Sequence, residues 1–183
     1  ARTQVRKGAQ VVDICLANPD RNEYADMTRF LPYVLNKVKA PLMLDSTDPA
    51  VLEAGLKLSQ GKVIINSVNL ENGLERLEKV IPLLKKYGGA VVVGLIDEEG
   101  MALTRERKLA VVERSYDILV NRYGFSPEDI IFDPLTFPVG TGDANYRGTA
   151  VETIEGLRMI KDRFPECKTI LGISNVSFGL PPA

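Results

Sequence analysis

The chain has 183 residues, with 23 basic and 24 acidic side chains, a formal net charge of −1 and no histidine. A chain so close to neutral lacks the electrostatic footprint for nucleic acid or an anionic membrane, and without histidine it can hold neither a Ser-His-Asp triad nor a zinc site built on histidine. No signal peptide or apolar stretch of about 18 residues is present, and Cys15 and Cys167 lack metal-like spacing, so we expect a cytoplasmic protein with a small-molecule ligand.

Six apolar runs of strand length follow one another, and each carries an Asp or Asn near its carboxyl end. They are residues 10–13, 41–45, 63–66, 91–97, 130–133 and 171–175, with Asp13, Asp45, Asn66, Asp97, Asp133 and Asn175 as the polar residues. Unbroken aliphatic runs are typical of buried parallel strands, and α/β folds place ligand chemistry at the carboxyl ends of such strands. We therefore expect a ring of carboxylates and amides facing one pocket.

Helical segments alternate with these strands. The pattern predicts the tail of a helix over residues 1–7 and helices over 27–38, 50–59, 74–87, 104–123 and 149–164. Asp48-Pro49 and Thr104 supply amino-terminal caps, whereas Gly88 and Gly124 supply carboxyl-terminal stops.

This alternation is the rhythm of βα units, so the sequence predicts an α/β fold of the (β/α)8 TIM-barrel type in a single domain, 1–183. A complete barrel needs roughly 250 residues, so about two of its eight units are expected to be absent. Because the chain begins inside a βα unit, we expect a fragment of a larger protein. Its two open strand edges could pair between copies, giving a homo-oligomer.

The polar residues at the strand ends also suit turns and helix caps, which is the alternative for each of them. Asp48 already serves as the predicted cap after the second strand, which leaves Asp45 free to face the pocket. Asn66 and Asn175 are each beside a serine, Ser67 and Ser174. Carboxylates that accept forked N–H bonds, together with amides, match a flat heterocycle such as a pterin or guanine-like ring.

Four phrases in order along the chain now resemble a known family. Residues 41–47 (PLMLDST), 65–68 (INSV), 131–134 (IFDP) and 172–179 (GISNVSFG) are similar to the pterin-binding barrel shared by cobalamin-dependent methionine synthase, the methyltetrahydrofolate:corrinoid methyltransferases and dihydropteroate synthase. The resemblance covers essentially the whole chain and implies that the family's first and eighth strands are missing. Residues 15–20 depart from the family's pattern, so no role is assigned to Asn18.

The resemblance implies a reaction. Dihydropteroate synthases carry a lysine motif on the seventh strand, whereas this chain has Asn175 and no lysine after Thr169. It therefore implies transfer of the methyl group of 5-methyltetrahydrofolate to a cob(I)alamin that a partner domain or protein supplies. Two alternatives are a dihydropteroate synthase-like pterin enzyme and a non-catalytic barrel fragment.

The resemblance also implies roles for the strand-end residues. Asp133 would pair with N3–H and the 2-amino group of the pterin, Asp45 and Asn66 would bind the remaining ring edge, and Asn175 would stabilise positive charge at N5 as the catalytic residue. The rest of the expected pterin-binding set is Asp13, Ser67 and Gly172.

Two segments remain with open interpretations. Asp97 is a pocket candidate, but residues 97–100 also fit an ordinary solvated turn, which we favour. The glycine-rich loop 137–148 lacks the lysine of a phosphate-binding P-loop, so we expect it to border the folate tail or the corrinoid partner.

Overall fold

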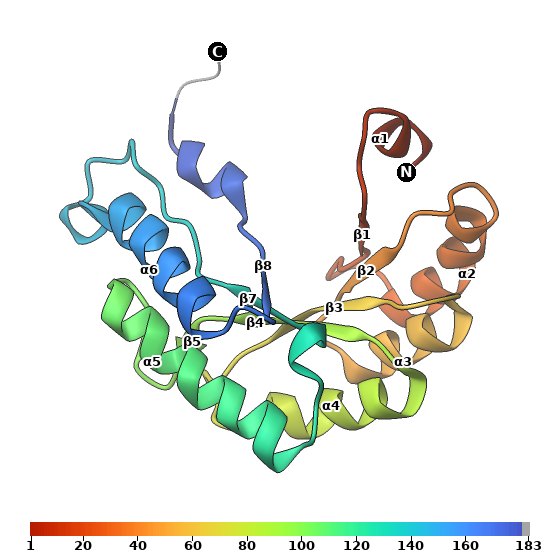
Figure 1. Cartoon of the computed structure of the whole chain (residues 1–183). Helices are drawn as coiled ribbons and strands as arrows, with labels where there is room; N and C mark the ends of the chain where they lie inside the picture. The colour runs from red at the N-terminus through yellow and green to blue at the C-terminus, as the bar shows by residue number, and fades with distance from the viewer. Residues whose placement is uncertain (181–183) are drawn as a thin grey trace. The chain divides into compact units, whose positions relative to one another are not determined.

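Helices and strands alternate along residues 1–180, the part of the chain that the computed structural model describes (Figure 1). Close contacts define two units: Ala1–Val68 with Leu77–Val91, and Asn69–Arg76 with Val92–Ala183. Within the described residues, strands pair in parallel inside each unit, and two further strands form a separate hairpin.

The first unit contains α1 (Arg2–Arg6), β1 (Val12–Cys15), α2 (Glu23–Leu35), β2 (Leu42–Asp45), α3 (Pro49–Leu58), β3 (Ile64–Val68) and most of α4 (Glu75–Tyr87). Strand β2 pairs in parallel with β1 on one side and β3 on the other. Helices α3 and α4 lie on the same side of β3, below it in Figure 1. The parallel direction places the carboxyl ends of the three strands at one edge.

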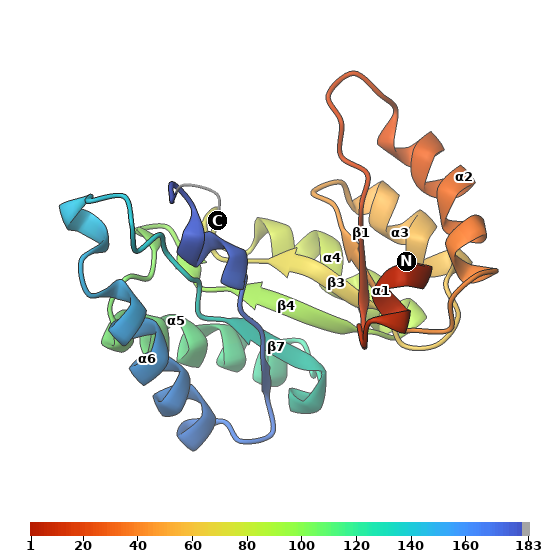
Figure 2. The same ribbon diagram turned by 90° about the horizontal axis from the view of Figure 1, so that it is seen from above.

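The second unit follows β4 (Ala90–Gly94), which begins in the first. It contains the hairpin β5 (Ile96–Asp97) and β6 (Gly100–Met101), α5 (Arg105–Tyr116) with a π-helical extension (Asp117–Arg122), a 3₁₀ turn (Pro127–Asp129), β7 (Ile130–Asp133), a 3₁₀ turn (Ala144–Tyr146), α6 (Thr149–Arg163), β8 (Lys168–Thr169) and a last 3₁₀ turn (Ile173–Ser177). Strands β7 and β8 are parallel. Helices α5 and α6 pack side by side, as Figures 1 and 2 show from two directions.

The predicted helix ends agree with the caps in the structure. Asp48 Oδ1 accepts the Ala50 N–H at 2.8 Å, and Thr104 Oγ1 accepts that of Arg107 at 3.3 Å. Gly88 and Gly124 adopt φ values of 77° and 63°, which favour glycine. Helix α2 begins four residues earlier than predicted, because Asn22 caps it by accepting the Ala25 N–H at 2.9 Å.

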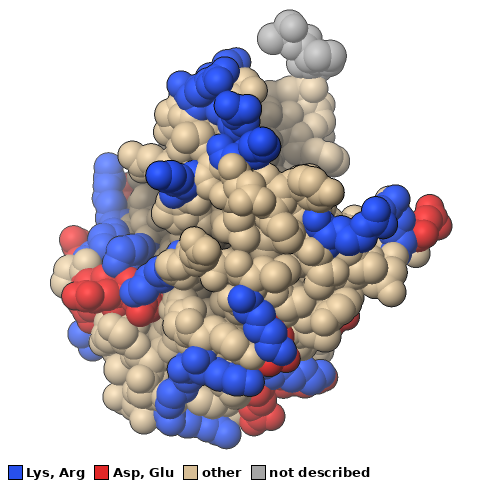
Figure 3. All heavy atoms as spheres, turned by 90° about the vertical axis from the view of Figure 1, so that its right-hand side faces the viewer, with Lys and Arg blue, Asp and Glu red and all other residues tan. Residues whose placement is uncertain are grey.

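Aliphatic side chains on the strands and the inner helix faces make the core. Leu44, Ile65 and Val91 are fully buried in the first unit, as are Leu95, Ile130 and Phe132 in the second. On the face drawn in Figure 3, basic side chains occur in separate groups rather than as one continuous surface. Through residue 180, no helix combines the length and the apolar character that crossing a membrane requires.

Several strand predictions were wrong in extent. Strand β1 continues to Cys15 and β3 to Val68, so Asp13 and Asn66 lie within these strands and not at their last residues. The run 91–97 is not one strand: β4 ends at Gly94, and Ile96–Asp97 pairs antiparallel with Gly100–Met101. The chain diverges because the Leu95 N–H bonds the Asp133 carbonyl while the Leu95 carbonyl accepts the Ala102 N–H.

The apolar run 171–175 is also not a strand, since β8 covers only Lys168–Thr169, before that run. Pairing stops where β7 ends at Asp133, and the last bond of this ladder is Ile170 N–H to the Phe132 carbonyl at 2.9 Å. Asn175 therefore lies in a 3₁₀ turn instead of at a strand end.

The Asp48 cap gives a stability prediction. Asp48→Ala should lower the free energy of unfolding by about 1 kcal/mol, because the Ala50 N–H loses its acceptor. Urea denaturation followed by circular dichroism measures the change. Asp48→Asn is the matched control, since asparagine caps as well as aspartate; an equal loss in both variants would contradict the capping role.

Candidate functional site

A cluster of polar side chains lies at, or within two residues of, the carboxyl ends of β1, β2 and β3 in the first unit. The parallel register sets Cys15 beside Asp45 and Asp45 beside Asn66. Asp13 precedes Cys15 by two residues, so both side chains project from the same face of β1. We call Asp13, Cys15, Asp45 and Asn66 the strand-end cluster.

Electrostatics within the strand-end cluster are unfavourable to a second negative charge. Burial raises the pKa of Asp13, the Asp45 carboxylate raises it further, and a hydrogen bond with the Asn66 amide opposes both. A hydrogen bond with the Ala17 backbone lowers the pKa of Cys15, but burial and the Asp45 carboxylate outweigh it and leave the pKa raised. Cys15 is therefore a poor nucleophile. The carboxylates of Asp13 and Asp45 can accept hydrogen bonds from N–H donors of a ligand.

The remaining predicted residues of the first unit lie near this cluster in sequence. Ser67 is half-buried on β3, directly after Asn66. Asn18 lies in the loop after β1, where its side chain accepts the Asp20 N–H at 2.9 Å. That loop borders a hollow of about 560 Å³, whose lining includes Cys15, Asn18 and Arg29.

In the second unit, Asp133 ends β7 at a tightly held corner formed by Asp133, Pro134 and Leu135. Asp133 Oδ1 accepts the Leu135 N–H at 2.9 Å, and Leu135 has a φ of 64°, which is rare for a residue with a branched side chain. Burial raises the pKa of Asp133, while the Leu135 N–H and the positive charge of Lys108 oppose this rise. The carboxylate keeps a second oxygen for an N–H donor of a ligand.

Gly172 and Asn175 are brought together by the last 3₁₀ turn. The Gly172 carbonyl accepts the Asn175 N–H at 3.0 Å and the Thr136 hydroxyl at 2.6 Å. A Cβ added to Gly172 would lie 3.3 Å from Asn175 Nδ2, so glycine leaves room for the amide. Asn175 is exposed, and its side chain is available to a ligand.

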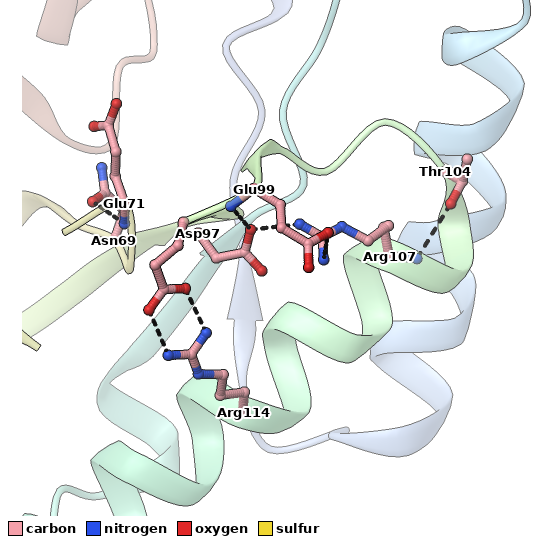
Figure 4. Close-up of polar contacts among 8 residues, drawn as sticks. Asn69, Glu71, Asp97, Glu99, Thr104, Arg107 and Arg114 are labelled. Carbon is pink, nitrogen blue, oxygen red and sulfur yellow. Dashed lines mark hydrogen bonds and ion pairs between the residues drawn. The ribbon is translucent and has the colours of Figure 1, made fainter. Parts of the chain in front are cut away.

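Asp97 is not the solvated turn residue that the sequence favoured. It is only 7% exposed, and its carboxylate accepts the Glu99 N–H at 3.0 Å and forms an ion pair with Arg107. Figure 4 shows Arg107 on α5 reaching both Asp97 and Glu99. Arg114 of the same helix forms an ion pair with Glu98. Asp97 therefore anchors the β5–β6 hairpin to α5.

The loop 137–148 packs partly on itself. The Phe137 and Tyr146 rings stack with centroids 5.5 Å apart, and the Val139 N–H bonds the Val176 carbonyl at 3.2 Å. Beside this loop is a hollow of about 240 Å³ lined in part by Tyr146 and Arg147.

The sequence analysis missed three side chains that hydrogen-bond the backbone next to Asp133 and Asn175 in the second unit. They are Lys108, Thr136 and Thr153. Lys108 is fully buried, and its ammonium donates to the Ala102 and Pro134 carbonyls at 2.7 and 2.6 Å. Thr153 donates to the Leu135 carbonyl at 2.9 Å. A signal for Lys108 exists, because it shares the buried face of α5 with Val111, Val112 and Ser115 at helical spacing.

Across residues 1–180, no group of three or more Asp, Glu, Cys or His side chains is arranged to hold a metal ion. The chemistry that these residues can perform is recognition of N–H groups by carboxylates and of mixed donors and acceptors by amides. This set suits a planar heterocycle.

Comparison with known proteins identifies the family of this chain. A model of the pterin binding enzyme family matches residues 1–183, and the chain belongs to that family. It is 41% identical to methionine synthase of Mycobacterium tuberculosis (strain ATCC 25618 / H37Rv) and 40% identical to that of Mycobacterium leprae (strain TN), in both cases over the whole chain. The chain spans only 16% and 15% of the length of these relatives.

Solved structures define the fold. Dihydropteroate synthase from Yersinia pestis with a pterine-sulfa conjugate superposes with a TM-score of 0.61 over 96% of this chain and 67% of that one, at 15% identity. The Xanthomonas albilineans enzyme with indole-2-carboxylic acid and 6-chloroguanine gives 0.62 over 94% of this chain and 61% of that one, at 17% identity. The predicted fold class, an incomplete α/β barrel of the pterin-binding type, is confirmed.

Lys108 gives a prediction about pH and stability. Burial lowers the pKa of Lys108 from 10.5 to about 8, so between these values the unfolded chain binds more protons than the folded one. Stability should therefore rise with pH across that window, by about 2 to 3 kcal/mol for this group. Urea unfolding of wild type and Lys108→Met gives the free energy of unfolding of each protein at pH 7.5 and at pH 10. The increase with pH should be larger in wild type, and the difference between the two increases is the contribution of Lys108. Equal pH dependence in both proteins would contradict it.

Proposed function

We propose that this chain binds 5-methyltetrahydrofolate and donates its N5-methyl group to a cob(I)alamin carried by another domain or protein. The observation that carries the proposal is the 41% identity to a methionine synthase over the whole chain, together with Asn175, and no lysine, in the segment after β8. The chain matches only 16% of the length of that methionine synthase, so the complete reaction is proposed for a longer protein in which a domain like this one is a part.

In this proposal the pterin is held by its hydrogen-bonding edge. Asp133 accepts N3–H and the 2-amino group, which requires an ionised carboxylate. Asp45 and Asn66 bind the remaining ring edge, with Ser67 and Asp13 beside them. Burial and the Asp45 carboxylate both raise the pKa of Asp13. N–H donors of a ligand would favour the ionised form of Asp13, which supports a ligand rich in such donors.

The chemical difficulty is the leaving group. A proton from solvent, delivered through a water network, would reach N5 first and give it a positive charge. The bond from N5 to the methyl carbon would then break, with its electron pair returning to N5 to give tetrahydrofolate while the methyl group passes to the reduced corrinoid. A neutral amide is a weak acid, so Asn175 acts by stabilising positive charge on N5 in the transition state, as a positioned dipole. Gly172 keeps the space beside the Asn175 amide open.

The corrinoid supplies the nucleophile, and a partner domain or protein carries it. We assign the loop 137–148 to the border of the folate tail or of this partner. A dihydropteroate synthase-like activity is the alternative. Its support is the fold, which at 14–18% identity carries no information on the reaction.

One experiment separates these readings. The full-length protein is mixed with cob(I)alamin and saturating 5-methyltetrahydrofolate, and the decay of cob(I)alamin absorbance is followed. Decay at a rate that depends on the protein supports the proposal. Folate binding without decay identifies a non-catalytic binder. In a separate assay that supplies an activated dihydropterin and 4-aminobenzoate, formation of dihydropteroate favours the alternative.

Asp133→Asn should weaken pterin binding more than folding. Asparagine keeps an oxygen for the Leu135 N–H but turns its own NH2 toward the ligand's N–H, so the affinity for 5-methyltetrahydrofolate should fall by about 2 to 3 kcal/mol. Isothermal titration on the full-length protein measures the loss, and Asp48→Asn is the control. Unchanged affinity would remove Asp133 from the site.

Asn175→Ala should slow methyl transfer about 100-fold or more if the amide acts on N5 in the transition state. Single-turnover decay of cob(I)alamin at saturating folate measures the rate constant, and a loss confined to affinity would mean that Asn175 only fixes the ring. Asn36→Ala is the control, because Asn36 is an exposed residue at the carboxyl end of α2 with no assigned role in the site. A wild-type rate constant at saturation would exclude the assigned role.

A further inference from the structure

We infer that Lys108 is a positioning residue for pterin recognition: its ammonium fixes the corner formed by Asp133, Pro134 and Leu135 and places a positive charge beside the Asp133 carboxylate. The inference rests on the proposed binding of a pterin by Asp133. It adds a residue that has no contact with the ligand and acts entirely through the carboxylate.

The setting of Lys108 is unusual for a lysine. Its side chain is fully buried, and two of its three ammonium protons bond carbonyl oxygens, of Ala102 after β6 and of Pro134 after β7. The Phe137 ring centroid is 5.1 Å from Nζ. Burying an ammonium without a bonded carboxylate is costly, and an apolar side chain would fill this space at less cost. The charge therefore requires a reason beyond packing.

Helix α6 is built to accommodate this side chain. Gly156 of α6 faces Lys108, and a Cβ at Gly156 would lie 2.9 Å from Lys108 Cδ. Thr153, one turn earlier on α6, donates to the Leu135 carbonyl at 2.9 Å. One face of α6 thus makes room for the lysine and also holds the corner that the lysine holds.

The corner needs such support. Leu135 has a φ of 64°, a conformation that costs a leucine free energy and persists only where the surroundings fix it. Three bonds meet there: Lys108 to the Pro134 carbonyl, Thr153 to the Leu135 carbonyl and the Leu135 N–H to Asp133 Oδ1. The last of these orients the carboxylate, so the direction of Asp133 depends on the other two.

Electrostatics give Lys108 a second effect. Burial raises the pKa of Asp133, whereas the Leu135 N–H and the charge of Lys108 favour the ionised form that forked recognition needs. Glu152 of α6 is a second negative charge that raises the pKa of Lys108. The Glu152 carboxylate, however, already accepts hydrogen bonds from the Arg105 backbone N–H at 2.8 Å and from the Arg105 guanidinium at 2.6 Å. The lysine charge therefore remains effective at Asp133.

The test is the pH dependence of 5-methyltetrahydrofolate binding to the full-length protein, measured by titration from pH 5 to 8. Lys108→Met should lower the affinity at pH 7 about 10-fold or more. It should also move the acid midpoint of binding upward by about 1 pH unit, because Asp133 loses a nearby cation and takes up its proton at higher pH. A general loss of structure would not move that midpoint.

Lys161→Met is the matched control. Lys161 also donates to two carbonyl oxygens, of Pro165 and Cys167 at 2.9 and 2.6 Å, but these lie at the other end of α6. Its affinity and acid midpoint should equal those of wild type. Wild type that fails to bind at any pH would overturn the proposed function, whereas wild-type behaviour of Lys108→Met would overturn only this inference.

Two further variants keep the test decisive if Lys108→Met does not fold. Lys108→Gln keeps hydrogen-bond donors without the charge, so an unmoved acid midpoint in it would overturn the electrostatic effect. Thr153→Val removes one bond of the corner and no charge, so it should lower affinity about 5-fold with the midpoint unmoved. Wild-type affinity of Thr153→Val would overturn the role of the corner.

Discussion

The parallel pairing of neighbouring strands is the constraint on which the rest of this structure depends. It aligns β1, β2 and β3 so that Cys15, Asp45 and Asn66 share one level at the carboxyl ends. Parallel strands need helical crossovers, and these return the chain to the opposite end each time. The polar residues after successive strands consequently gather although 21 to 32 residues separate Asp13, Asp45 and Asn66 in sequence.

Features governed by local interactions could be predicted from the sequence. The Asp48-Pro49 start of α3 and the Thr104 start of α5 each depend on a side chain within three residues of the N–H it caps. The stops at Gly88 and Gly124 depend on backbone conformations that glycine favours. The neighbouring positions of Asp45 and Asn66 also follow from the sequence, because repeated aliphatic runs mark the parallel strands, whereas the place of Cys15 beside them was not predicted.

What failed depends on contacts between distant segments. The end of β8 is set by the end of β7, and the break after β4 by bonds from Leu95 to Asp133 and Ala102, neither of which leaves a mark in the local pattern. Asp97 resembled a solvated turn because its partner Arg107 lies across the hairpin on α5. Lys108 could have been noticed only as a charge on an apolar helix face.

The candidate carboxylates Asp133 and Asp13 have different electrostatic surroundings in their two units. Burial raises the pKa of Asp133, and the Leu135 N–H and the Lys108 cation oppose this rise. Asp13 faces the Asp45 carboxylate with only the Asn66 amide to offset burial and repulsion. Unrelieved like charges reduce the stability of the protein alone, and such a cost is typical of binding sites. In the proposed function, N–H donors of the pterin would offset this repulsion, which a donor-poor ring of the same shape would not do.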